Sequence, residues 1–104
     1  MARKYEVKIT VTAENDIKSI FDHLARDNPQ AAAKWVTEIE RQIDSLELFP
    51  QRCPVIPELE ELGHPYRHLI YVDYRTVFRI EGSTVIILRV IHGARLLNLR
   101  MFEK

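Results

Sequence analysis

The sequence predicts an α+β fold: an N-terminal strand, an antiparallel helical hairpin and a three-stranded antiparallel meander, forming one sheet with the helices on one face. Apolar residues alternate with polar ones near both ends of the chain. Between residues 17 and 46 they recur instead every three or four positions. The 104 residues suffice for one hydrophobic core, so residues 1–104 are expected to form a single domain.

The first strand and the first helix are predicted within residues 6–25. Val7, Ile9 and Val11 alternate with polar residues, which is typical of a strand buried on one face. We expect Thr12 to cap the following helix, because a threonine side chain can accept a hydrogen bond from a first-turn N–H. That helix has one apolar stripe, formed by Ile17, Ile20, Phe21, Leu24 and Ala25.

The second helix is predicted to follow at once. Asn28 is its expected N-cap and Pro29 its first residue, where a missing N–H costs nothing. It should end before Pro50, because the residue before a proline avoids helical backbone. Its apolar residues are spaced alternately four and three positions apart, which suits antiparallel packing on the first helix. They are Ala32, Val36, Ile39, Ile43 and Leu46.

Residues 50–65 are predicted to form a loop, because they contain four prolines and an acidic run. A loop of this length is unusual in a small domain, so it has either a function or a short element that the pattern does not reveal. Three strands should follow, over residues 67–72, 74–80 and 84–92, with turns at Val72-Asp73 and at Gly82. Residues 96–104 suit either a short helix or an extended arm.

The last strand is predicted to be apolar on both faces. On the middle strand, the face that meets the helices should carry Tyr74, Thr76, Phe78 and Ile80. On the last strand, the inward set should be Ile86, Leu88, Val90 and His92, and the opposite set Val85, Ile87 and Ile91 beside Arg89. A sheet covered on one side is normally polar on the other, so the tail or another polypeptide should cover this second face. The expected core is Ile20, Phe21, Leu24, Ile39, Ile43, Phe78, Leu88 and Val90.

Composition excludes several classes of protein. No apolar run is long enough to cross a membrane, and the N-terminus lacks a signal-peptide cleavage site. Cys53 is the only cysteine, so no intrachain disulfide can form and a cytoplasmic location is expected. Cys53, His64 and His68 lack the paired spacing of a zinc site, so no metal and no cofactor are expected. Net charge is zero, but the last third is locally cationic, with six arginines between residues 66 and 100.

Several segments, in order, resemble the RelE/ParE superfamily of type II toxin–antitoxin toxins. They read DNPQAAAKW, LELFPQRCPVIPEL, YRHLIYVDYRTVFRI and VIILRVIHGAR, and the likeness spans nearly the whole chain. The resemblance implies the same α+β fold, a growth-inhibiting target and a cognate antitoxin that wraps the toxin. It is compatible with a heterotetramer or a higher toxin–antitoxin complex.

RelE-like members of the superfamily cut messenger RNA on the ribosome without a metal. Arg75 and Arg95 match two arginines of that family's catalytic set, and His92 is a candidate general base. The family's lysine pair falls on Tyr66 and His68, and its C-terminal tyrosine on Met101, so half of the set is absent. The alternative interpretation of His92 is a strand-end histidine bonded to the backbone.

ParE-like members lack the RelE set and are associated with poisoning DNA gyrase. The DNPQAAAKW, LELFP and HGAR segments favour this branch, as does a net charge ill-suited to binding among ribosomal phosphates. We therefore expect a ParE-like gyrase poison that is not an enzyme. A RelE-like messenger-RNA endoribonuclease is the first alternative, and an inactive member that only binds its antitoxin is the second. The antitoxin is expected to contact Arg75, Arg79, Val85, Ile87, Arg89, Ile91 and Arg95.

Overall fold

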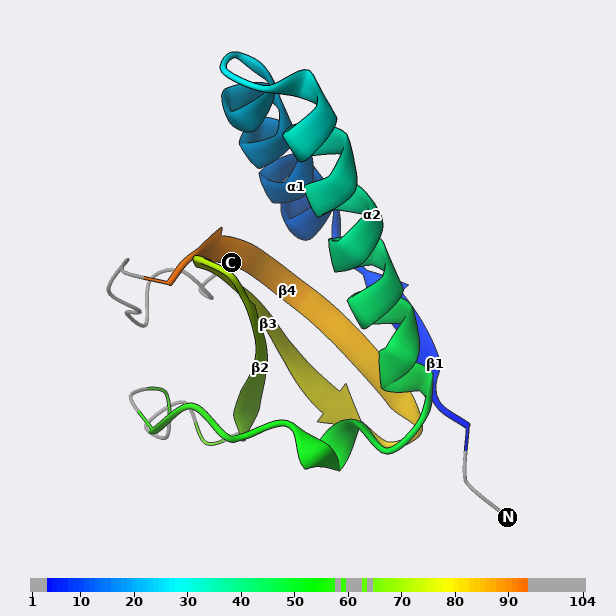
Figure 1. Ribbon diagram of the computed structural model, residues 1–104. Helices are drawn as coiled ribbons and strands as arrows, with labels where there is room; N and C mark the ends of the chain where they lie inside the picture. The colour runs from blue at the N-terminus through cyan, green and yellow to red at the C-terminus, as the bar shows by residue number, and fades with distance from the viewer. Residues whose placement is uncertain (1–3, 58, 60–62, 64, 94–104) are drawn as a thin grey trace.

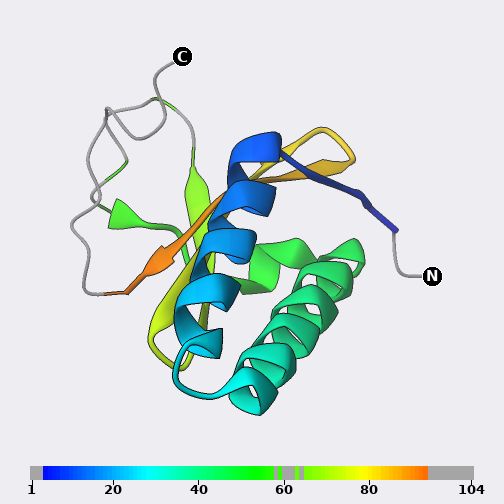
Figure 2. The ribbon, with the colours of Figure 1, turned by 90° about the horizontal axis from the view of Figure 1, so that it is seen from above.

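The computed structural model describes residues 4–57, 59, 63 and 65–93, and it places a helical hairpin on one face of a four-stranded sheet (Figures 1 and 2). The helices are α1 (Val11–Ala25) and α2 (Pro29–Asp44), followed by the short 3-10 helices η1 (Ser45–Glu47) and η2 (Pro50–Arg52). The strands are β1 (Glu6–Ile9), β2 (Tyr66–Tyr71), β3 (Tyr74–Glu81) and β4 (Thr84–His92), in the spatial order β1-β4-β3-β2.

The sheet is mixed, whereas the sequence predicted an antiparallel meander and did not predict the direction of the first strand. The β2–β3–β4 meander is antiparallel as predicted, with the two turns at Val72-Asp73 and at Gly82. β1, however, pairs with β4 in parallel, so that Glu6 lies opposite Thr84. The direction of this pairing depends on how the helical hairpin returns the chain to the sheet, and alternation within a strand does not encode it.

The helices begin at side-chain caps, one of which differs from the prediction. Asn28 caps α2 as predicted, its Oδ1 accepting from the N–H of Ala31 at 3.1 Å, with Pro29 as the first helical residue. α1 is capped by Thr10 instead of Thr12. The Thr10 hydroxyl accepts from the N–H of Ala13 at 3.1 Å and donates to the carbonyl of Ile87 at 2.9 Å. The cap that starts α1 thus also ties the helix to β4.

A bulge in β4 changes which of its residues face the helices. Phe78 of β3 lies opposite Ile87, whereas the preceding Val77 lies opposite Arg89, so Leu88 is an extra residue. An extra residue reverses the alternation of side chains along a strand. The predicted face assignment of β4 is therefore wrong before the bulge, where Val85 and Ile87 point into the core, and right for Val90 after it.

The main core lies between the helical hairpin and the sheet. Four of the residues predicted there are fully buried, namely Ile39, Ile43, Phe78 and Val90. Ile20 and Leu24 pack on this core while partly exposed, and Phe21 is also half-buried. Leu88 was predicted in the same core but belongs to a second cluster.

The second cluster covers the opposite face of the sheet. Ile56 and Leu59, from the segment between α2 and β2, are fully buried there against Tyr66, Val77 and Ile91. In Figure 1 this green segment runs along the side of the sheet away from the helices. It is held to β2 by the N–H of Ile56, which donates to the carbonyl of Tyr66 at 2.7 Å. The proline-rich segment therefore has a structural role, and it supplies the cover that the sequence assigned to the tail or to another polypeptide.

Candidate functional site

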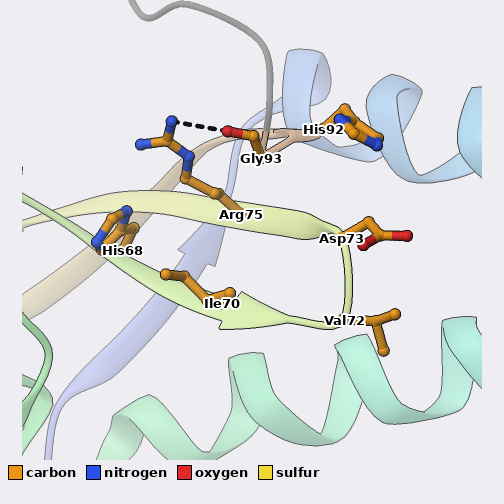
Figure 3. A pocket seen from close by; sticks show the side chains of 7 residues that line it. All are labelled: His68, Ile70, Val72, Asp73, Arg75, His92 and Gly93. Atoms are coloured by element: carbon orange, nitrogen blue, oxygen red, sulfur yellow. Dashed lines mark hydrogen bonds between the residues drawn. The ribbon is translucent and has the colours of Figure 1, made fainter.

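Two hollows flank the turn between β2 and β3. The first, here called the Arg75 hollow, has a volume of about 420 Å³ and is shown in Figure 3. It is lined by His68, Ile70, Val72, Asp73, Arg75, His92 and Gly93. Ile70 and Val72 are 62% and 70% exposed. Large apolar side chains exposed together beside a hollow are typical of a surface that binds a partner.

Arg75 is fixed at the β4 side of this hollow. Its Nη2 donates to the carbonyl oxygen of Gly93 at 2.9 Å, and the N–H of Gly93 donates to the carbonyl of Asp73 at 2.6 Å. A Cβ at residue 93 would lie 3.2 Å from that carbonyl oxygen, so glycine permits the close approach. A guanidinium has five N–H donors, so Arg75 can bind a carboxylate or a phosphate while keeping this bond.

His92 borders the hollow at the end of β4, but its ring packs toward the helix side of the sheet. It pairs with Tyr74, and their rings pack edge to face with centroids 5.4 Å apart. Tyr74 in turn packs edge to face on Trp35 of α2, at 5.2 Å. Figure 3 shows the His92 ring turned away from the Arg75 guanidinium. Arg75 and His92, two of the three predicted catalytic residues, thus border the same hollow with their functional groups pointing apart, and the third, Arg95, lies outside the described residues.

His68 is the histidine that lies on the same face as Arg75. Arg75 is directly opposite Ile70 on β2, and His68 is two positions before Ile70, so alternation places both on one face. The sequence drew attention to His68 as a zinc ligand, which its spacing excludes, and as the residue at the position of a lysine of the RelE set. The register of β2 against β3 is what places His68 on the face of Arg75. That register follows from the turn at Val72, so residue 68 by itself does not reveal its position.

Arg89 and Arg79 have partners within the chain. Arg89 donates from Nε and Nη2 to the two carboxylate oxygens of Asp16, at 2.8 and 3.1 Å. Asp16 Oδ2 also accepts from the N–H of Val90, next to the bulge. The hydrogen bond to Asp16 raises the pKa of Arg89, which keeps the guanidinium charged. At the surface, Nη2 of Arg79 lies 3.2 Å from Oε2 of Glu81. Contacts of either arginine with the antitoxin remain predictions.

The apolar residues predicted to meet the antitoxin are not on the surface. Val85 and Ile87 are 0% exposed beneath the helices, and Ile91 is 3% exposed beneath the segment that carries Ile56. The expectation of an open apolar face on β4 is therefore wrong. There are two physical reasons for this difference. The bulge turns Val85 and Ile87 inward, and the proline-rich segment covers the other face of the sheet.

The second hollow, here called the Trp35 pocket, lies on the helix side of the same turn. It has a volume of about 350 Å³ and is lined by Leu24, Ala31, Lys34, Trp35, Tyr71, Val72, Asp73 and Tyr74. Val72 and Asp73 therefore border both hollows. The indole N–H of Trp35 is buried and has no hydrogen-bond acceptor within the described part of the chain. No pattern in the sequence indicates this pocket, because it forms only where the hairpin meets the β2–β3 turn.

The remaining reactive groups do not form a site in the described residues. Between residues 4 and 93, the positions that can be described contain no cluster of three or more histidine, cysteine, aspartate or glutamate side chains able to hold a metal. Cys53 is buried, and this burial raises the pKa of its thiol despite the neighbouring Arg52 and Arg67. None of the described helices is both long and apolar enough to span a membrane.

This arrangement of helices and sheet is shared with known toxins. The family described as "ParE toxin of type II toxin-antitoxin system, parDE" matches residues 7–97. Because the match covers most of the chain, this protein belongs to the ParE toxin family, within the RelE/ParE toxin superfamily.

Individual relatives carry both names of the superfamily. Toxin RelE1 of Caulobacter vibrioides is 30% identical over 90 residues, which cover 86% of this chain and 94% of that protein. The structure of the toxin–antitoxin complex RelBE2 from Mycobacterium tuberculosis contains a similar chain, with a TM-score of 0.54 and 28% identity over 86% of this chain and 98% of that one. A chain of the chromosomal ParDE system of P. aeruginosa has the same fold, with a TM-score of 0.67 and 23% identity over 88% and 98% of the two chains.

Proposed function

We propose that this toxin is a ParE-like poison of DNA gyrase, neutralised in the cytoplasm by a cognate antitoxin. The observation that carries the proposal is that the His92 ring packs on Tyr74 and points away from the Arg75 guanidinium, although both residues border the same hollow. Metal-free cleavage of RNA needs a base, an acid and cations around one phosphate. The described residues offer Arg75 and His68 on one face without such a set, whereas a binding poison needs no acid–base pair.

One observation favours the RelE-like alternative. Arg75 and His68 share a face, and a guanidinium beside an imidazole could bind a phosphate of messenger RNA and move a proton. The relative named Toxin RelE1 is also similar over most of its length. Under this reading the partners are the ribosome and messenger RNA.

Two assays on the same purified protein separate the readings. A ParE-like toxin inhibits supercoiling of relaxed plasmid by gyrase and leaves cellular RNA intact. A RelE-like toxin leaves gyrase active, and RNA sequencing after induction shows abundant new 5′ ends within codons. Arg75→Ala should remove the RNA ends while the fold survives, and the surface variant Arg41→Ala on α2 serves as its matched control.

The outcomes are distinct. New RNA ends that depend on Arg75 would overturn the gyrase proposal. Harmless overexpression together with antitoxin binding would identify an inactive member whose sole remaining activity is to bind its antitoxin. We expect the antitoxin complex to be a heterotetramer or larger, which sedimentation of the co-expressed pair measures.

A further inference from the structure

We propose that the Trp35 pocket is the anchor site for one large apolar side chain of the antitoxin. A carbonyl or carboxylate oxygen of the same antitoxin segment accepts a hydrogen bond from the indole N–H of Trp35. The inference rests on the proposed function in one respect, since it takes the partner to be the antitoxin. It assigns to α2 and the β2–β3 turn the contact that the sequence placed on β4.

The first argument is the unpaired indole N–H. Trp35 is 6% exposed, and its Nε1 has no acceptor among the described residues although its ring borders the pocket. Buried indole N–H groups are nearly always paired, because the group has lost its water and needs a replacement. An occupant of the pocket that carries an acceptor would complete the site after a small shift of the Trp35 and Tyr74 rings.

The second argument is the shape and lining of the pocket. Its walls are mainly apolar and aromatic, from Leu24, Trp35 and Tyr74, and its volume of about 350 Å³ suits a large side chain. Lys34 and Asp73 are exposed at its border. A buried apolar anchor inside a polar rim is the usual composition of a binding hot spot.

The third argument identifies the occupant from charge and continuity. The Trp35 pocket and the Arg75 hollow share Val72 and Asp73, so an extended segment crossing the turn reaches both. Such a segment passes Lys34 in the Trp35 pocket and Arg75 in the Arg75 hollow. The single carboxylate that lines the two hollows is that of Asp73. The fitting partner is therefore an extended peptide with an apolar anchor and flanking acidic residues, as in an antitoxin tail that orders on binding.

The turn itself is held in a conformation that its sequence disfavours. Val72 has a φ of 55° and is 70% exposed, although a β-branched residue rarely adopts positive φ. Burial of Val72 therefore cannot be what maintains this geometry. Backbone strain of this kind concentrates at binding sites, where the surrounding structure fixes it.

The test uses the fact that Trp35 is the only tryptophan of the chain. A ¹⁵N-labelled toxin gives a single indole N–H signal, to be followed while the cognate antitoxin is added after its recovery from the denatured complex. We expect the indole proton to move downfield and to become protected from exchange. Ala31→Phe, which fills the pocket from α2, should weaken binding by at least about thirtyfold.

Two further variants keep the result interpretable. Ala33→Phe places the same side chain at an exposed position of α2 that does not line the pocket, and it should bind normally. Lys34→Glu reverses the charge at the rim without touching the core, and it should weaken binding and reduce its dependence on salt.

An indole signal that does not move on binding would overturn the inference, as would normal binding by Ala31→Phe. If Ala31→Phe bound the antitoxin normally and also failed to inhibit gyrase, the inference would be overturned in favour of the target as the occupant of the pocket. The binding measurement does not depend on gyrase. A chain that spares gyrase but binds antitoxin through Trp35 would refute the proposed target and keep this inference.

Discussion

The ion pair between Asp16 and Arg89 gives the sharpest test of how the helical hairpin is attached to the sheet. The Asp16 carboxylate on α1 accepts two hydrogen bonds from Arg89 and one from the N–H of Val90, all on β4. The side chains of Arg89 and Asp16 are 17% and 16% exposed. Asp16→Ala therefore leaves a largely buried guanidinium and a backbone N–H beside the bulge without acceptors.

The expected loss follows from these contacts. Breaking a buried ion pair costs about 3–5 kcal/mol, and an unpaired buried N–H costs about 1–3 kcal/mol. Because the two side chains remain partly exposed, water can replace some of the lost hydrogen bonds. We therefore expect Asp16→Ala to lower the free energy of unfolding by about 3 kcal/mol. Asp16→Asn keeps an acceptor for Val90 and should lose about half as much.

Urea unfolding followed by circular dichroism and by Trp35 fluorescence measures these changes. A loss of about 3 kcal/mol corresponds to a Tm lower by about 12–24 °C in a domain of this size. Glu38→Ala, which breaks the surface pair with Arg41, is the matched control and should change stability within experimental error. Adding Arg89→Met to Asp16→Ala should restore part of the loss, since an uncharged side chain needs no partner. If Asp16→Ala were as mild as Glu38→Ala, the reasoning would fail.

Three further predictions concern the fold. Ile87→Ala should cost about 2–5 kcal/mol and Ile86→Ala clearly less in the same urea assay, because Ile87 is fully buried and Ile86 half-buried; equal losses would show that the bulge is misplaced. Val72→Gly should raise the free energy of unfolding by about 1 kcal/mol, because glycine tolerates positive φ and the exposed valine packs little; a loss would mean that the turn is not strained. Burial raises the pKa of Cys53, so the unfolded thiol ionises first and stability should fall above about pH 9; Cys53→Ala should remove that part of the alkaline decline, and an unchanged pH profile would contradict the assignment.

The site could be predicted only in part. Motif matching selected Arg75, which the structure places at a hollow, because one arginine position on a strand can be recognised locally. It could not show that His92 faces the helices while Arg75 faces away, or that His68 shares the face of Arg75. It also gave no indication of the Trp35 pocket, whose walls come from α1, α2, β2 and β3.

The sequence by itself determined the order of the elements, the Asn28 cap, both hairpin turns and the inward face of β3. These features depend on interactions among neighbouring residues, such as a cap, a proline or a period of two. Tertiary structure alone decided the parallel pairing of β1, the bulge at Leu88 and the cover that Ile56 and Leu59 give to the second face. Each of these joins residues far apart in the chain, where packing of the whole domain outweighs local preference.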